Sequence, residues 1–86
     1  MREWCFQITD PCGLHAKPAS MLMMTARKFQ SEIRGDLNKY SADLKNVIEI
    51  LGLGAEFGDR VLIRAEGPDE AEAIEAIKEA FEKERG

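Results

Sequence analysis

Two hydrophobic periods alternate along this short chain, and this alternation is the strongest constraint on its fold. Trp4, Phe6 and Ile8 occupy every second position before Asp10-Pro11, the period of a half-buried strand. Similar patterns predict strands at 33–37, 40–43 and 60–66, and helical spacing predicts helices over 16–29 and 47–51 and from 68 onward. Strands and helices interleaved as βαββαβα in 86 residues imply an α+β, two-layer open-faced sandwich, in which helices cover one face of a sheet.

The helix predictions rest on apolar stripes and on residues that favour helix ends. The first helix has its stripe at Ala19, Leu22, Met23, Ala26 and Phe29, and the last helix at Ile74, Ile77 and Phe81. Asn46 is a strong N-cap for the short middle helix, and Glu49 three residues later predicts a capping box. Pro68 is predicted to open the last helix, with Asp69 and Glu70 in its first turn.

The only histidine, His15, lies where the first strand has ended and the first helix is about to begin. A helix start leaves backbone N–H groups unpaired and has about half a unit of positive charge, so it can bind an anion. Pro18 suits the first turn because it lacks an N–H, while the amides of Ala16 and Lys17 remain free to face an anion. Since neutral imidazole is a nucleophile, the position predicts a covalent phosphate carrier. Position alone leaves open the alternative of a capping or surface histidine.

The segment Gly13-Leu14-His15-Ala16-Lys17-Pro18-Ala19 closely resembles the active-site signature of the HPr family, the phosphocarriers of the bacterial phosphoenolpyruvate-dependent sugar phosphotransferase system. Further matches at Leu44-Lys45, at Leu53-Gly54 and from Arg60 onward extend the resemblance over nearly the whole chain. It implies a four-stranded antiparallel sheet in the order 1-4-2-3, covered on one face by three helices. It also implies that His15 accepts a phosphoryl group on Nδ1 from phosphorylated enzyme I and donates it to IIA domains, as a carrier and not as an enzyme.

The resemblance also implies roles for residues around His15. Those expected to stabilise the phosphate are Cys12, Ala16, Lys17 and Pro18. The family generally has arginine where Lys17 stands and often serine where Cys12 stands; lysine loses the planar two-point contact, and a thiol is the weaker hydrogen-bonding group. The expected docking surface for partners comprises Lys17, Ser20, Met21, Met24, Val47, Ile48 and Leu51. For the two methionines, a merely apolar helix flank is the alternative, although methionine suits a surface that fits several partners.

Asn46 occupies the position of a regulatory serine. In many Gram-positive members of the family, the residue after Lys45 is a serine that a dedicated kinase phosphorylates. Asparagine caps a helix about as well as serine, but it has no hydroxyl to phosphorylate. Asn46 is therefore predicted to keep the structural role and not to be phosphorylated.

Composition excludes several classes of protein. Residues 1–86 are predicted to form a single domain, and a formal net charge of −4 argues against nucleic acid as a partner. Lys17, Arg27 and Lys28 are expected on the first helix and acidic residues crowd the last, so an acidic partner would be steered towards the histidine.

The two cysteines, Cys5 and Cys12, are too few for a disulfide framework, and Cys12 with His15 lacks the further ligands of a zinc site. Neither a metal nor a cofactor is expected. Without a long apolar segment or a signal-peptide pattern, the chain is predicted to be cytoplasmic and not inserted in a membrane. The resemblance implies a monomer.

Two alternative functions stay open at this point. The same histidine could serve a nitrogen-related or a dihydroxyacetone-kinase phosphorelay. In a different class, the chain could be a noncatalytic α+β binding domain in which His15 is only a cap. An independently acting enzyme is disfavoured, because the sequence has no paired general acid and base, no complete metal set and no nucleotide-type glycine loop.

Overall fold

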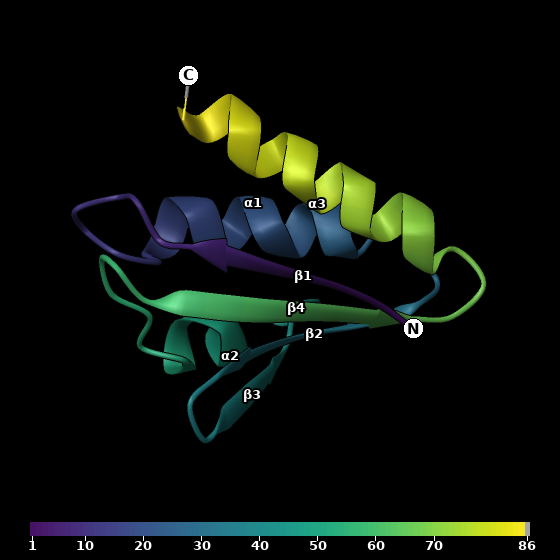
Figure 1. Ribbon diagram of the computed structural model, residues 1–86, viewed down its shortest axis with the longest axis horizontal. Helices are drawn as coiled ribbons and strands as arrows, with labels where there is room; N and C mark the ends of the chain where they lie inside the picture. The colour runs from purple at the N-terminus through teal and green to yellow at the C-terminus, as the bar shows by residue number, and fades with distance from the viewer. Residues whose placement is uncertain (86) are drawn as a thin grey trace.

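A computed structural model describes residues 1–85, and its elements follow the predicted order. They are β1 (Arg2–Gln7), α1 (Ala16–Ala26), β2 (Glu32–Leu37), β3 (Tyr40–Asp43), α2 (Val47–Gly52), β4 (Arg60–Glu66) and α3 (Glu70–Arg85). The four strands form one antiparallel sheet in the order β1-β4-β2-β3 (Figure 1). The α+β class, the βαββαβα succession and the implied strand order are confirmed.

The register of the sheet separates an apolar face from a polar one. Ile63 of β4 lies opposite Trp4 of β1 on one side and Gly35 of β2 on the other. The buried apolar strand residues are Phe6, Ile33, Leu37, Ala42, Val61, Ile63 and Ala65. Because successive side chains of a strand point to opposite faces, the residues between them form the open face. There Arg64 Nη2 donates a hydrogen bond to Asp36 Oδ1 at 3.1 Å.

The three helices cover the apolar face. α1 and α3 pack against each other, and α3 also contacts β1 and β4, whereas α2 contacts α1 and β3 (Figure 1). Their buried residues join those of the strands in one hydrophobic core; they are Ala19, Leu22 and Ala26 of α1, Ile50 of α2, and Ala73, Ile74 and Ile77 of α3. The helix stripes expected from the sequence therefore face the sheet.

α1 is shorter than the sequence predicts, because it ends at Ala26 and not near Phe29. The amides of Lys28 and Phe29 bond to carbonyls three residues back, which tightens the chain into a turn. The prediction that Arg27 and Lys28 lie on this helix is therefore wrong. Phe29 nevertheless packs against the core from the turn, as its place in the apolar stripe suggests.

α3 begins at Glu70, so the prediction that Pro68 opens it is wrong. The Asp69 side chain bonds to the chain that follows α1: its carboxylate accepts hydrogen bonds from the amides of Gln30 (2.8 Å) and Ser31 (2.9 Å). Gly67 lies so close to Ser31 that an added Cβ would clash with its backbone. This connection fixes the start of α3 against the chain that follows α1. Among residues 1–85, no helix combines the length and the apolarity needed to cross a membrane.

Candidate functional site

His15 is the N-cap residue of α1, and its ring is not used to cap the helix. Its backbone is extended (φ −97°, ψ −170°), and its carbonyl accepts the first helical bond, from the Ala19 amide at 3.0 Å. Within the described part of the chain, the imidazole makes no capping hydrogen bond, and its side chain is 41% exposed. The ring is thus available at the helix start and open to a partner.

A close approach between two loops brings His15 to this position. Gly13 has φ +73°, and a Cβ on it would lie 2.6 Å from the Ala55 carbonyl oxygen. The next residue, Leu14, donates its amide to that same oxygen at 2.9 Å, and its side chain is buried. The same two segments are joined again where the Gly58 amide donates a hydrogen bond to the Ile8 carbonyl at 2.9 Å. The loop before α1 is therefore fixed against the loop between α2 and β4.

Asp10 holds the turn after β1 and reaches the imidazole. Its Oδ1 accepts a hydrogen bond from the Cys12 amide at 2.8 Å, and its carbonyl accepts one from the Gly13 amide at 2.9 Å. Its Oδ2 lies 3.1 Å from His15 Nε2. The Cys12 amide, and then the contact with His15, lower the pKa of the Asp10 carboxyl below its ordinary value. Asp10 is therefore ionised at neutral pH.

The start of α1 has the backbone features on which the predicted anion site depends. The amides of Ala16 and Lys17 belong to the first turn, so no helical carbonyl lies four residues before them, and Pro18 has no amide to satisfy. The first turn contains no acidic residue, and the Lys17 side chain is exposed. Cys12 is exposed and has a free thiol, while its amide is bonded to Asp10. The phosphate-stabilising roles of these residues stay predictions.

Five of the expected docking residues are apolar side chains of α1 and α2. We call these five residues the apolar rim; they are Met21, Met24, Val47, Ile48 and Leu51. Met24 is 63% exposed, Ile48 76% and Leu51 43%, whereas Met21 and Val47 are half-buried. Ser20, also expected at this surface, is half-buried.

Two hydrogen bonds hold the end of α1 to Lys45, two residues before α2. Arg27 Nε donates to the Lys45 carbonyl at 2.8 Å, and Lys45 Nζ donates to the Phe29 carbonyl at 2.7 Å. The cation of Lys45 thus satisfies a carbonyl just beyond a helix C-terminus, where positive charge is favourable. The two helices that bear the apolar rim are fixed relative to each other.

Asn46 caps α2 as predicted, but the prediction of a capping box with Glu49 is wrong. Asn46 Oδ1 accepts hydrogen bonds from the amides of Ile48 (3.0 Å) and Glu49 (3.2 Å). A capping box would have Glu49 accept from the Asn46 amide. That amide bonds instead to the Asp43 carbonyl at 3.0 Å, and the Glu49 carboxylate accepts from the Asp43 amide. Glu49 therefore connects α2 to the end of β3.

The sequence pattern marks Asp10 only as the end of a strand and predicts no role for Phe57. The Asp-Pro-Cys order is a signal for Asp10, because an aspartate often accepts from the amide two residues later. No local signal predicts its contact with His15, which depends on the left-handed backbone of Gly13. Phe57 is an exposed aromatic residue in the loop that contacts Gly13 and Leu14.

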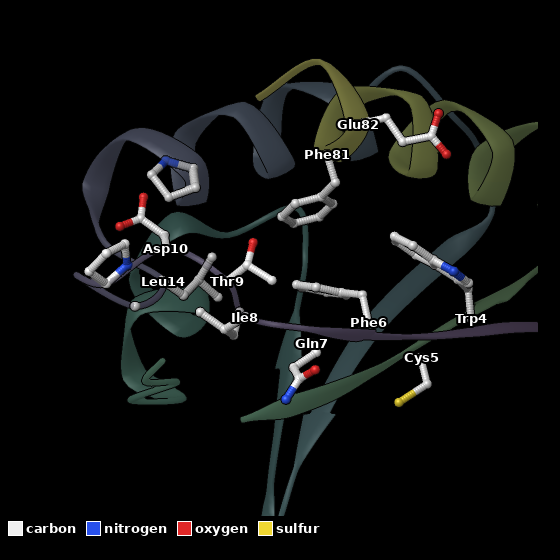
Figure 2. A pocket seen from close by; sticks show the side chains of 13 residues that line it. Trp4, Cys5, Phe6, Gln7, Ile8, Thr9, Asp10, Leu14, Phe81 and Glu82 are labelled. Atoms are coloured by element: carbon white, nitrogen blue, oxygen red, sulfur yellow. The ribbon is translucent and has the colours of Figure 1, made fainter. Parts of the chain in front are cut away.

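A pocket lies beside this site, between β1 and the end of α3 (Figure 2). Its aromatic wall is formed by Trp4, Phe6 and Phe81, with ring centroids of Phe6 and Phe81 4.2 Å apart. Figure 2 shows Asp10 near one end of the pocket and Glu82 near the other. The lining includes Asp10 and Pro18 but not His15, so the pocket adjoins the loop before α1 and the first turn of that helix.

Comparison with known proteins gives a consistent result. A model of the HPr component phosphorylation site of the phosphotransferase system matches residues 3–83. The phosphocarrier protein HPr of Mycoplasma genitalium is 39% identical over 84 residues, which are 96% of each chain. The solved structure of a histidine-containing phosphocarrier protein from Mycoplasma has a TM-score of 0.91 at 36% identity, covering 93% of this chain and 91% of that one. HPr from Thermoanaerobacter tengcongensis has a TM-score of 0.89 at 38% identity, covering 95% and 92%.

The fold and these matches define a phosphoryl carrier, a protein that shuttles phosphoryl groups and is not itself an enzyme. The chain belongs to the HPr family and is a phosphocarrier of the sugar phosphotransferase system. The alternative of a noncatalytic binding domain is therefore wrong.

Gly13→Ala is expected to lower the free energy of unfolding by more than the cost of placing alanine in a left-handed backbone, because the new Cβ would also clash with a neighbouring loop. A Cβ there meets the Ala55 oxygen at 2.6 Å, while Gly54, with φ +64°, has open space where its Cβ would lie. Gly54→Ala should cost about 1 kcal/mol of unfolding free energy and Gly13→Ala at least about 2 kcal/mol. Chemical denaturation measures both variants. Equal losses would contradict the steric role of Gly13.

Proposed function

We propose that His15 is the residue that accepts the phosphoryl group, on Nδ1, and passes it on. The observation that carries this proposal is the half-exposed imidazole at the start of α1, directly before the first-turn amides of Ala16 and Lys17. Because Nε2 faces Asp10, Nδ1 is the ring nitrogen left for phosphorus. The partial positive charge of the helix start would attract the phosphoryl oxygens.

The phosphoryl group must be held only moderately, since a carrier has to release it again. Two main-chain amides and the cation of Lys17 would provide such binding, together with Pro18 in the first turn and the exposed Cys12. Lysine is a point charge without the planar fork of arginine, so it holds the oxygens with less orientation. The site thus favours transfer over storage.

The partners that fit this role are phosphorylated enzyme I as donor and IIA domains as acceptors, in the cytoplasm. They would dock on the apolar rim, together with Lys17 and Ser20 at the start of α1. Apolar side chains that are exposed in a fixed arrangement commonly mark a protein interface. The whole chain, residues 1–86, would act as one domain and as a monomer, because a transfer complex needs the rim free.

His15→Ala is expected to abolish labelling from phosphoenolpyruvate in the presence of enzyme I, because the chain has no second imidazole. The label on the wild type should be acid-labile, as a phosphoramidate is. The Tm of the variant should lie within about 3 °C of the wild type, since the ring is partly exposed and makes no cap. Equal labelling of the two proteins would contradict the proposed role of His15.

Met24→Glu is expected to lower kcat/KM for phosphoryl transfer about tenfold by placing a charge in the apolar rim, with little change in Tm. Tyr40→Glu is the matched control, because Tyr40 is also 63% exposed but lies at the β2–β3 hairpin. NMR shifts of rim residues should move most when enzyme I or a IIA domain is added. Shift changes confined to the open face of the sheet would rule out this docking surface.

The wild type is expected to stay unlabelled when it is incubated with HPr kinase and ATP, because Asn46 has no hydroxyl. Asn46→Ser should gain an acid-stable phosphate, since a helix start tolerates an added anion. Phosphopeptide mass spectrometry identifies the modified residue. Stoichiometric, acid-stable labelling of the wild type would show that another residue serves as the acceptor.

A further inference from the structure

The contact between Asp10 and His15 determines which ring nitrogen carries hydrogen. Asp10 Oδ2 lies 3.1 Å from His15 Nε2, and Oδ1 is held by the Cys12 amide. An ionised carboxylate can only accept hydrogen bonds. The hydrogen of this contact therefore belongs to Nε2, and a neutral ring in that tautomer has its free electron pair on Nδ1.

The same contact adds little to the stability of the fold. Both side chains are partly exposed, 41% for His15 and 47% for Asp10, and exposed charge pairs contribute little because water and salt screen them. Its consequence is for the orientation and protonation of the ring. Asp10 is itself fixed by hydrogen bonds to Cys12 and Gly13, so it presents Oδ2 in a defined direction.

We propose that Asp10 is a positioning residue for phosphoryl transfer: it holds His15 in the Nε2–H tautomer and so presents the Nδ1 electron pair to the donor. This inference rests on the proposed role of His15 as the acceptor. A carboxylate that orients an imidazole through the nitrogen opposite the reacting one is a known device in nucleophilic catalysis.

The charges balance in the transfer step. Nδ1 forms a bond to phosphorus while the bond between phosphorus and the donor atom breaks, and the electron pair of that bond leaves with the donor. The hydrogen on Nε2 stays in place, so the phosphorylated ring has imidazolium character. The negative Asp10 carboxylate beside Nε2 stabilises that positive charge. In the onward transfer the electron pair of the Nδ1–phosphorus bond returns to Nδ1.

Asp10→Asn provides the sharpest test. If the asparagine oxygen keeps the hydrogen bond from Cys12, its NH₂ group faces Nε2 and donates to it, which favours hydrogen on Nδ1. Long-range ¹⁵N NMR of the ring should show Nδ1 unprotonated in the wild type and protonated in a large fraction of the variant. The kcat/KM for labelling by phosphorylated enzyme I should fall at least about tenfold, and more than in Asp10→Ala, which cannot donate.

Asp59→Asn is the matched control. Asp59 accepts a hydrogen bond from the Glu56 amide at 2.9 Å in the adjacent loop, so it resembles Asp10 in its main-chain contact. This variant should keep the wild-type tautomer and the wild-type labelling rate. Tm values of all three variants measure any loss of fold.

An Asp10→Asn protein with the wild-type tautomer and the wild-type labelling rate would overturn the inference. That outcome leaves the acceptor role of His15 intact, because labelling still requires the imidazole. Labelling of His15→Ala is the separate result that would overturn the proposed acceptor itself.

Discussion

The close approach of the Gly13 backbone to Ala55 is the constraint on which the site depends. The left-handed φ of Gly13 turns the chain after Asp10, and the missing side chain lets the Ala55 oxygen lie where a Cβ would be. That oxygen also accepts a hydrogen bond from the amide of Leu14, and the buried side chain of Leu14 packs in the core just before α1 begins. His15 therefore follows a segment that is hydrogen-bonded to a second loop and directly precedes a helix, so its backbone position is defined.

The His15 ring lies at the positively charged start of a helix and beside the negative carboxylate of Asp10. In the proposed transfer, the start of α1 and Lys17 would supply positive potential for the phosphoryl oxygens, while Asp10 places a negative charge beside Nε2. An anion on the ring would thus be attracted by the helix start, and the cationic character of the phosphorylated ring would be stabilised by Asp10. All of these groups are near water, which keeps each interaction weak and suits a group that must leave again.

The apolar rim shows how a small domain exposes apolar side chains without losing its core. α1 and α2 each bury part of their residues against the sheet, and the opposite sides expose Met24, Ile48 and Leu51. Lys45 and Arg27 hold the two helices together by bonding to main-chain oxygens and not to other charges. These bonds keep the spacing of the rim fixed while its methionine side chains stay adaptable.

The sequence by itself determined the type and order of the elements, the start of α1 at Ala16, the cap at Asn46 and the position of His15, because hydrophobic period and capping chemistry act over a few residues. The tertiary structure decided where side chains find partners across the fold. Asp69 accepts a hydrogen bond from Ser31, 38 residues away in the sequence, and α3 begins later than Pro68 suggests. Asp10 contacts His15 only because the chain turns at Gly13. Strand order likewise came from family resemblance and not from periodicity, since a period specifies the faces of a strand but not its neighbours.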